Sequence, residues 1–152
     1  MIKVNLKAME YGKERIRKEL LYLEEKENGF KIAVSNIRGS HPCGYIGVPK
    51  SYLNNLGLDD KRIADATCYD FSADVHCGFT YCGSTIWTDE SELLMEDGGL
   101  WLGWDYAHLG DYCADEYYVE PPRFDEKTYT TEDIIEEANM AIETLEWYGS
   151  EE

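Results

Sequence analysis

Histidines and carboxylates recur at short intervals in two stretches of the sequence, DVHCGFTYCG (74–83) and WLGWDYAHLGDYC (101–113). Two histidines with carboxylates suit zinc, manganese or iron, and such a metal lowers the pKa of a bound water for hydrolysis. In the alternative, the same groups cap turns and hydrogen-bond within a structural network. The candidate metal ligands are Asp74, His76, Asp105, His108 and Asp111, and the catalytic candidates are His76, His108, Asp105 and Asp111.

Five cysteines accompany these residues, but their spacing is not typical of a zinc site. The sequence has Cys77-x4-Cys82 and His108-x4-Cys113 where structural zinc sites usually have C-x2-C or H-x3-H pairs. Adjacent residues on a strand point to opposite faces, so Cys77 is badly placed to use His76 as a base, and a nucleophilic pair would need His108. We interpret the cysteines as small buried hydrophobic residues and expect no cofactor, apart from the divalent metal of the hydrolase alternative.

Aromatic side chains are concentrated in the second stretch and just after it. If this stretch is a strand, Trp101 faces one side of the sheet, while Trp104 and Tyr106 belong to the other. One set can then enter the core while the other is exposed or lines a groove, and Trp and Tyr are also the residues that anchor interfaces. A binding surface would comprise Trp101, Trp104, Tyr106, Tyr112, Tyr45 and Tyr81.

The surrounding pattern predicts one α+β domain over residues 1–152, a mostly antiparallel sheet with an N-terminal helix and a C-terminal helix packed on it. Residues 11–27 place Ile16, Leu20 and Leu23 on one helical face before an Asn-Gly stop. Near the other end, Thr130 and Asp133 resemble a capping box ahead of an apolar stripe that runs from 134 to 145.

Between the two helices, β-branched and aromatic runs separated by turn signals predict the strands of the sheet. A short helical turn or an irregular connection is expected at 49–58. No internal repeat or linker divides the chain, and a chain of 152 residues can bury one sizeable core. The expected strands are residues 30–37, 45–48, 74–76, 79–81, 85–87 and 100–106.

The chain is strongly acidic, with 31 Asp and Glu against 14 Lys and Arg and a formal net charge of −17. Residues 63–122 contain thirteen acids and no Lys or Arg. Nucleic-acid binding depends on Lys and Arg to neutralise phosphates, so we expect no direct nucleic-acid binding and a basic protein as the natural partner. Because there is no long apolar run, no apolar leader and no disulfide framework, we expect a cytoplasmic protein without a membrane partner.

Three stretches in this order, HPCGYIGVP (41–49), VHCGFTY (75–81) and WLGWDYAHLGD (101–111), resemble a group of small phage and prophage proteins without a settled function. In that group the corresponding stretches are GYVGVP, VHGGLTY and WWxGFDxAHxGD. Cys77 stands where the family has glycine. The resemblance covers about residues 41–111, and the matching positions are Gly44, Tyr45, Gly47, Pro49, His76, Gly78, Thr80, Tyr81, Gly103, Asp105, His108, Gly110 and Asp111.

Charge and resemblance together indicate a phage-type accessory protein of an infected or lysogenic bacterial cell that works by stoichiometric binding. Its expected target is a basic, nucleic-acid-handling host protein such as a restriction or CRISPR effector. One alternative is a small-molecule binder that sequesters a nucleotide signal, with aromatic side chains for stacking and Arg38, Lys50, Arg62 or Arg123 for phosphates. The other alternative is the small metal-dependent hydrolase.

Overall fold

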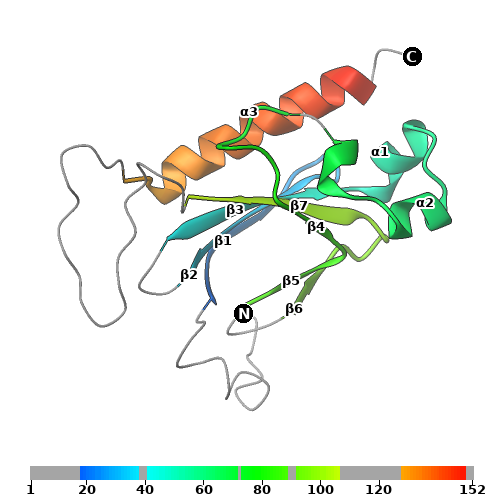
Figure 1. The fold of residues 1–152 in the computed structure, drawn as a ribbon. Helices are drawn as coiled ribbons and strands as arrows, with labels where there is room; N and C mark the ends of the chain where they lie inside the picture. Colours follow the sequence, from blue (N-terminus) through cyan, green and yellow to red (C-terminus); the bar gives the residue numbers. More distant parts are fainter. Residues whose placement is uncertain (1–17, 38–40, 72, 89–91, 107–127, 150–152) are drawn as a thin grey trace.

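The computed structural model describes residues 18–37, 41–71, 73–88, 92–106 and 128–149 as an antiparallel sheet covered on both faces (Figure 1). Five strands follow the order β1-β2-β3-β7-β4, and β5 pairs with β6 in a separate two-stranded sheet. The α+β class with its C-terminal helix is confirmed. The elements are β1 (Lys18–Glu25), β2 (Lys31–Ile37), β3 (Pro42–Val48), α1 (Lys50–Asn55), α2 (Asp60–Ala64), the 3-10 turn η1 (Cys68–Asp70), β4 (Tyr81–Gly83), β5 (Thr85–Trp87), β6 (Glu92–Leu94), β7 (Leu100–Asp105) and α3 (Thr131–Gly149).

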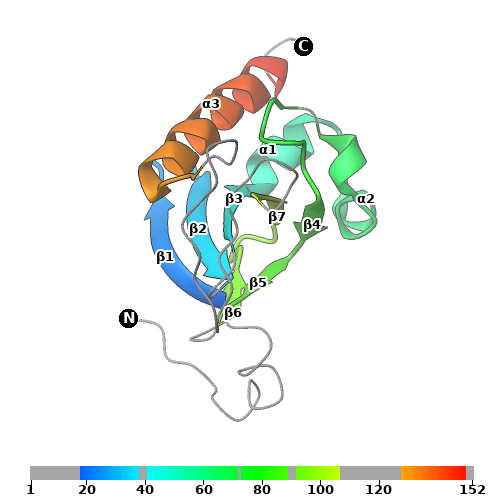
Figure 2. The same ribbon diagram turned by 60° about the vertical axis from the view of Figure 1, so that its left-hand side comes forward.

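The predicted N-terminal helix is wrong over Lys18–Glu25, which forms β1 at one edge of the sheet (Figure 2). The segment KELLYLEE also alternates with a period of two, and it pairs with β2 along its length around an irregularity at Leu21. Tyr22 packs against the core beneath α3, while Leu20 packs against the core on the other face. Pairing with β2 therefore overrides the local helical pattern. Residues 11–17 of that prediction lie outside the described residues.

Four of the six predicted strands are confirmed, one is wrong and one begins later than predicted. Residues 30–37 contain β2, 45–48 lie in β3, and 85–87 and 100–106 correspond to β5 and β7. The strand predicted at 74–76 is wrong, because a turn that includes His76 and Cys77 occupies this position, with positive φ at Cys77 (60°) and Gly78 (82°). The strand predicted at 79–81 begins only at Tyr81, and β6 arises within an acidic run that gave no strand signal. The helical turn expected in 49–58 is α1.

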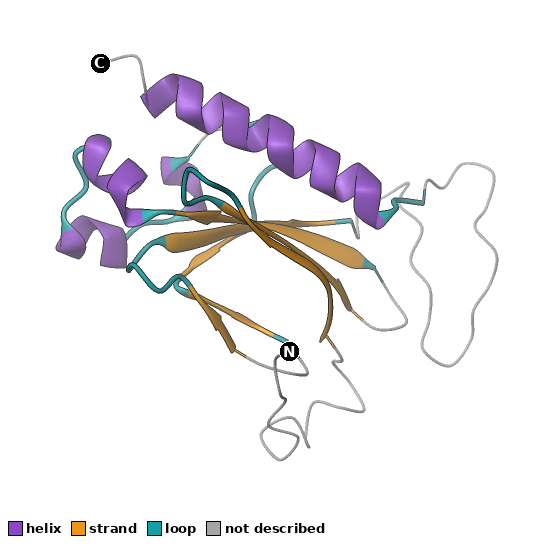
Figure 3. Cartoon of the chain, turned by 180° about the vertical axis from the view of Figure 1, so that it is seen from behind, coloured by secondary structure: helices purple, strands orange, loops and turns teal. Residues whose placement is uncertain are grey.

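The larger core lies between the five-stranded sheet and α3, which crosses one face of it (Figure 3). Ile134, Ala138, Ile142 and Leu145 of α3 are buried there, as the apolar stripe predicts. The capping box is also confirmed: the Asp133 backbone N–H donates to Thr130 Oγ1 (3.1 Å), and the Thr130 N–H donates to the Asp133 carboxylate (3.0 Å). None of the helices in the described part of the chain combines the length and apolarity that crossing a bilayer requires.

A smaller core lies on the opposite face, where the β5–β6 pair covers the sheet. Trp101 points into this core, while Trp104 and Tyr106 point into the larger one, so the predicted division between faces is confirmed. Each of the three side chains is only 1% exposed. Both faces of β7 are therefore core, and neither aromatic set is left at the surface.

Candidate functional site

The predicted histidine and carboxylate group is divided between the two faces of the sheet. Asp105 lies opposite Cys43 in the register of β7 with β3 and lines a hollow beside β5. The next residue, Tyr106, faces the larger core and stacks on His76, with ring centroids 4.8 Å apart and planes at 13°. His108 and Asp111 lie outside the described residues. Among the described residues, no three His, Cys, Asp or Glu side chains are grouped so that they could hold a metal ion.

An acidic hollow of about 440 Å³ lies between the N-terminal half of α3 and the segment that carries His76. Four carboxylates line it, and no Lys or Arg side chain is among its described lining residues. The carboxylates of Asp133, Glu136 and Glu137 on α3 and of Asp74, two residues before His76, thus share one concave surface. The lining residues of this acidic hollow are Asp74, Val75, His76, Tyr129, Asp133, Glu136, Glu137 and Met140.

The back wall of the acidic hollow is a stack of aromatic rings fixed by the core. The Tyr129 ring centroid lies 5.0 Å from that of His76 and 4.5 Å from that of Tyr106. The Trp104 indole N–H donates to the Tyr106 hydroxyl (2.8 Å), and the His76 backbone N–H donates to the Glu137 carboxylate. Burial, and to a lesser extent the nearby Glu137 carboxylate, raises the pKa of Tyr106, so its hydroxyl stays protonated.

A second hollow of about 350 Å³ continues from the acidic hollow along α3 and shares Asp74 and Met140 with it. The side chains of Met140, Trp147 and Tyr148 are 61%, 58% and 48% exposed, although large apolar groups usually avoid water. The Trp147 and Tyr148 rings contact each other edge to face, 5.1 Å apart. We call the acidic hollow and this neighbour together the α3 groove.

No family model, no curated protein and no solved structure matches this chain in the comparisons with known proteins. The resemblance to phage proteins therefore stays a prediction from the three sequence stretches. Because a fold alone does not imply a function, the function of this chain has to be argued from the chemistry of its surfaces.

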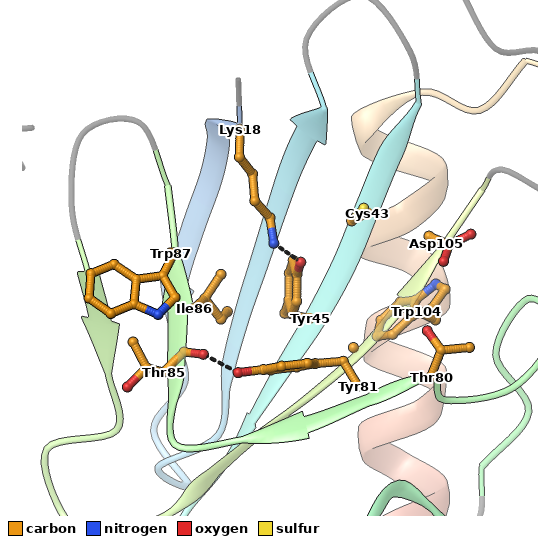
Figure 4. A pocket seen from close by; sticks show the side chains of 11 residues that line it. Lys18, Cys43, Tyr45, Thr80, Tyr81, Thr85, Ile86, Trp87, Trp104 and Asp105 are labelled. Carbon is orange, nitrogen blue, oxygen red and sulfur yellow. Dashed lines mark hydrogen bonds between the residues drawn. The ribbon is translucent and has the colours of Figure 1, made fainter. Parts of the chain in front are cut away.

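On the other face of the sheet, a hollow of about 290 Å³ lies between β3, β4, β7 and the β5 strand (Figure 4). The Lys18 ammonium donates to the Tyr45 hydroxyl, and Tyr81 contacts Tyr45 edge to face, 6.1 Å between centroids. Gly103 makes room for the Tyr45 ring, because a Cβ there would lie 2.7 Å from it. Burial lowers the pKa of Lys18 and raises that of Tyr45. We call this the tyrosine hollow.

The six predicted binding aromatics separate into three groups. Trp101, Trp104 and Tyr106 are core residues, and Tyr106 acts only as support for the acidic hollow. Tyr45 and Tyr81 line the tyrosine hollow, with Tyr81 38% exposed, and the buried Trp104 borders this hollow as well. Tyr112 lies outside the described residues. The sequence interpretation missed Tyr129, Trp147 and Tyr148; the last two stand outside the apolar stripe of α3, which was the signal that could have identified them.

Cys43 lines the tyrosine hollow, and burial raises the pKa of its thiol to about 11. Since the thiolate is the reactive form, we expect iodoacetamide at pH 8 to modify Cys43 at least about tenfold more slowly than the exposed Cys77. Raising the pH from 8 to 10 should accelerate the modification of Cys43 strongly, because its thiolate fraction keeps growing up to the raised pKa. Peptide mass spectrometry gives both rates, and equal rates at pH 8 would contradict this prediction.

Proposed function

We propose that this protein acts by stoichiometric binding, as an acidic inhibitor of a basic, nucleic-acid-handling protein of the restriction or CRISPR type. In this proposal it works in the cytoplasm of an infected or lysogenic bacterial cell. The observation that carries the proposal is the α3 groove, because it joins a concave acidic surface to exposed Met140, Trp147 and Tyr148.

The composition of α3 supports this proposal. The helix contains six acids and no Lys or Arg, and the residues on its outer side are exposed. An acidic surface accelerates encounter with a basic partner and disfavours nucleic acid, whereas buried aromatic anchors supply most of the affinity of an interface. The apolar stripe of α3 packs on the sheet, whereas Trp147 and Tyr148 lie outside that stripe and are exposed.

Inhibition of a purified effector nuclease tests the proposal. We expect DNA cleavage to stop at one inhibitor per effector, and the Kd to rise at least about tenfold between 50 and 500 mM NaCl, because surface charges are screened by salt. The double substitution Trp147→Ala and Tyr148→Ala should weaken binding at every salt concentration. Tyr69→Ala is the matched control, since Tyr69 is 94% exposed and does not line the α3 groove.

Two results would contradict the proposal. One is an affinity for effectors that is indifferent to salt, and the other is inhibition at far less than one inhibitor per effector, which would indicate turnover instead of binding. Failure to inhibit any restriction or CRISPR nuclease would exclude this class of partner.

The two alternatives have less support in the described residues. A nucleotide in the tyrosine hollow would meet Lys18 as the only Lys or Arg among the described lining residues. Lys50 is paired with Asp60 (2.8 Å) and Arg62 lines a different hollow, while Arg38 and Arg123 lie outside the described residues. For the hydrolase, Asp74 and His76 line the acidic hollow, but Asp105 lies on the other face of the sheet, so the described candidate ligands do not converge.

A further inference from the structure

We infer that the acidic hollow binds the guanidinium group of an arginine side chain presented by the partner protein. The inference rests on the proposed function and names the chemical group that the α3 groove recognises. Its support comes from three observations: two carboxylates that the fold does not use, aromatic rings held in place behind them, and a neighbouring hollow with exposed Met140, Trp147 and Tyr148.

Two of the four carboxylates have no structural role within the described part of the chain. Asp133 caps α3, and Glu137 accepts the His76 backbone N–H. Asp74 and Glu136 are exposed and make no hydrogen bond or ion pair with the described residues. Four carboxylates around one hollow repel one another, and a cation placed among them would relieve that repulsion. The hollow is therefore set up for a positively charged group.

The aromatic wall favours a planar cation. Tyr129 is half-buried and is braced by His76 and by the buried Tyr106, which is itself held by Trp104. A guanidinium group can lie flat on such a ring while its edge donates to carboxylates in a fork, whereas an ammonium is a more strongly hydrated point charge. We therefore expect arginine to bind more tightly than lysine.

The neighbouring hollow gives the partner a second point of attachment. Met140 and Asp74 border both hollows, so the two hollows adjoin each other along α3. Glu136 and Trp147 are eleven residues apart on one helix, which corresponds to about 16 Å along its axis. A partner segment that carries an arginine and an apolar or aromatic residue about this far apart would cover the whole α3 groove.

Binding of small probes to the full-length protein tests the inference. With 13C-methyl methionine labelling, N-acetyl-L-arginine amide should shift the Met140 methyl signal in a saturable way, with a Kd in the millimolar range. N-acetyl-L-lysine amide should bind at least about threefold more weakly, and the neutral isostere N-acetyl-L-citrulline amide should cause no saturable shift. Met140→Leu assigns the signal among the four methionines.

Variants separate the hollow from the general acidity of the protein. Glu136→Gln and Tyr129→Leu should each weaken arginine binding at least about threefold, while Tyr129→Phe, which keeps the ring, should preserve it. Glu132→Gln is the matched control, because it removes the same charge from an exposed residue of the first turn that does not line the hollow. It should leave the Kd unchanged.

Equal binding of citrulline, or equal effects of Glu132→Gln and Glu136→Gln, would overturn the arginine site. If the protein nevertheless inhibited an effector, and this inhibition weakened with rising salt concentration, the proposed function would still be supported. In the reverse case, binding of the arginine probe with the expected variant pattern but no inhibition of any effector would retain the site and remove the proposed function.

Discussion

Trp104→Ala is expected to destabilise the protein by about 3–5 kcal/mol, a large part of the 5–15 kcal/mol that is typical of a single domain. Trp104 is 1% exposed and packs in the core beneath α3, where its indole N–H donates to Tyr106. The substitution leaves a cavity and also removes the donor that the buried Tyr106 hydroxyl uses. Urea unfolding followed by circular dichroism measures the change in the free energy of unfolding.

Trp87→Ala provides the matched control for this prediction. Trp87 is 60% exposed on the other side of the sheet, so its loss should cost less than about 1 kcal/mol. If the two substitutions destabilised the protein equally, the assignment of Trp104 to the main core would be wrong. The comparison also bears on the site, because Trp104 supports the aromatic wall of the acidic hollow through Tyr106.

Gly99→Ala is expected to cost about 3 kcal/mol or more, at the upper end of the range for overpacking. A Cβ on Gly99 would fall well inside van der Waals contact with the backbone carbonyl oxygen of Val48, and a backbone atom cannot rotate away. Val48 pairs with Leu100 at the end of the β3–β7 ladder, so relief of the clash would open the central strand pair of the sheet. The same unfolding measurement applies.

Gly98→Ala is the control that distinguishes the cost of a steric clash from the cost of a positive φ. Gly98 has φ of +88°, but the nearest atom to a Cβ there would be Lys50 Cδ at 3.5 Å, so Gly98→Ala should cost only about 1–2 kcal/mol. The expected order is Gly99→Ala worse than Gly98→Ala. The reverse order would mean that positive φ, and not the close approach of Val48, controls this corner of the fold.

The two cores explain how the α3 groove is formed. The apolar stripe from Ile134 to Leu145 fixes the rotation of α3 on the sheet, so Glu136, Met140 and Trp147 remain on the outer side. The buried end of β7 then brings Tyr106 beneath His76. The acidic hollow is therefore a consequence of helix docking and of the register of β7, and it needs no separate structural element.

Much of this fold could be predicted because its signals are local. Thr130, Asp133 and the stripe that follows them specify α3 within one segment, and β-branched runs identify β2 and β3 in the same way. The segment KELLYLEE is different, because it suits either a helix or a strand when taken alone. Whether this segment forms a helix or a strand depends on its pairing with β2, and no local sequence pattern encodes that contact.

The candidate site was less predictable for the same reason. The spacing of Asp105, His108 and Asp111 suggested one group with His76, but the side-chain alternation of β7 sends Asp105 and Tyr106 to opposite faces. His76 follows a segment that is not a strand, so its position depends on Glu137 and Tyr106, which are distant in sequence. Within the described residues, the His76 ring therefore packs against Tyr106 and Tyr129, while Asp105 lies on the other face of the sheet.

The amino-acid sequence by itself determined the acidity of the protein, the α+β class, the capped C-terminal helix and the division of Trp101 from Trp104 across one strand. These properties depend on composition and on short periodicities. Only the tertiary structure decided that both tryptophans are buried and that His76 and Tyr129 meet the acids of α3. The physical reason is that burial and the convergence of distant side chains depend on which surfaces pack together, and that packing is settled by the whole chain at once.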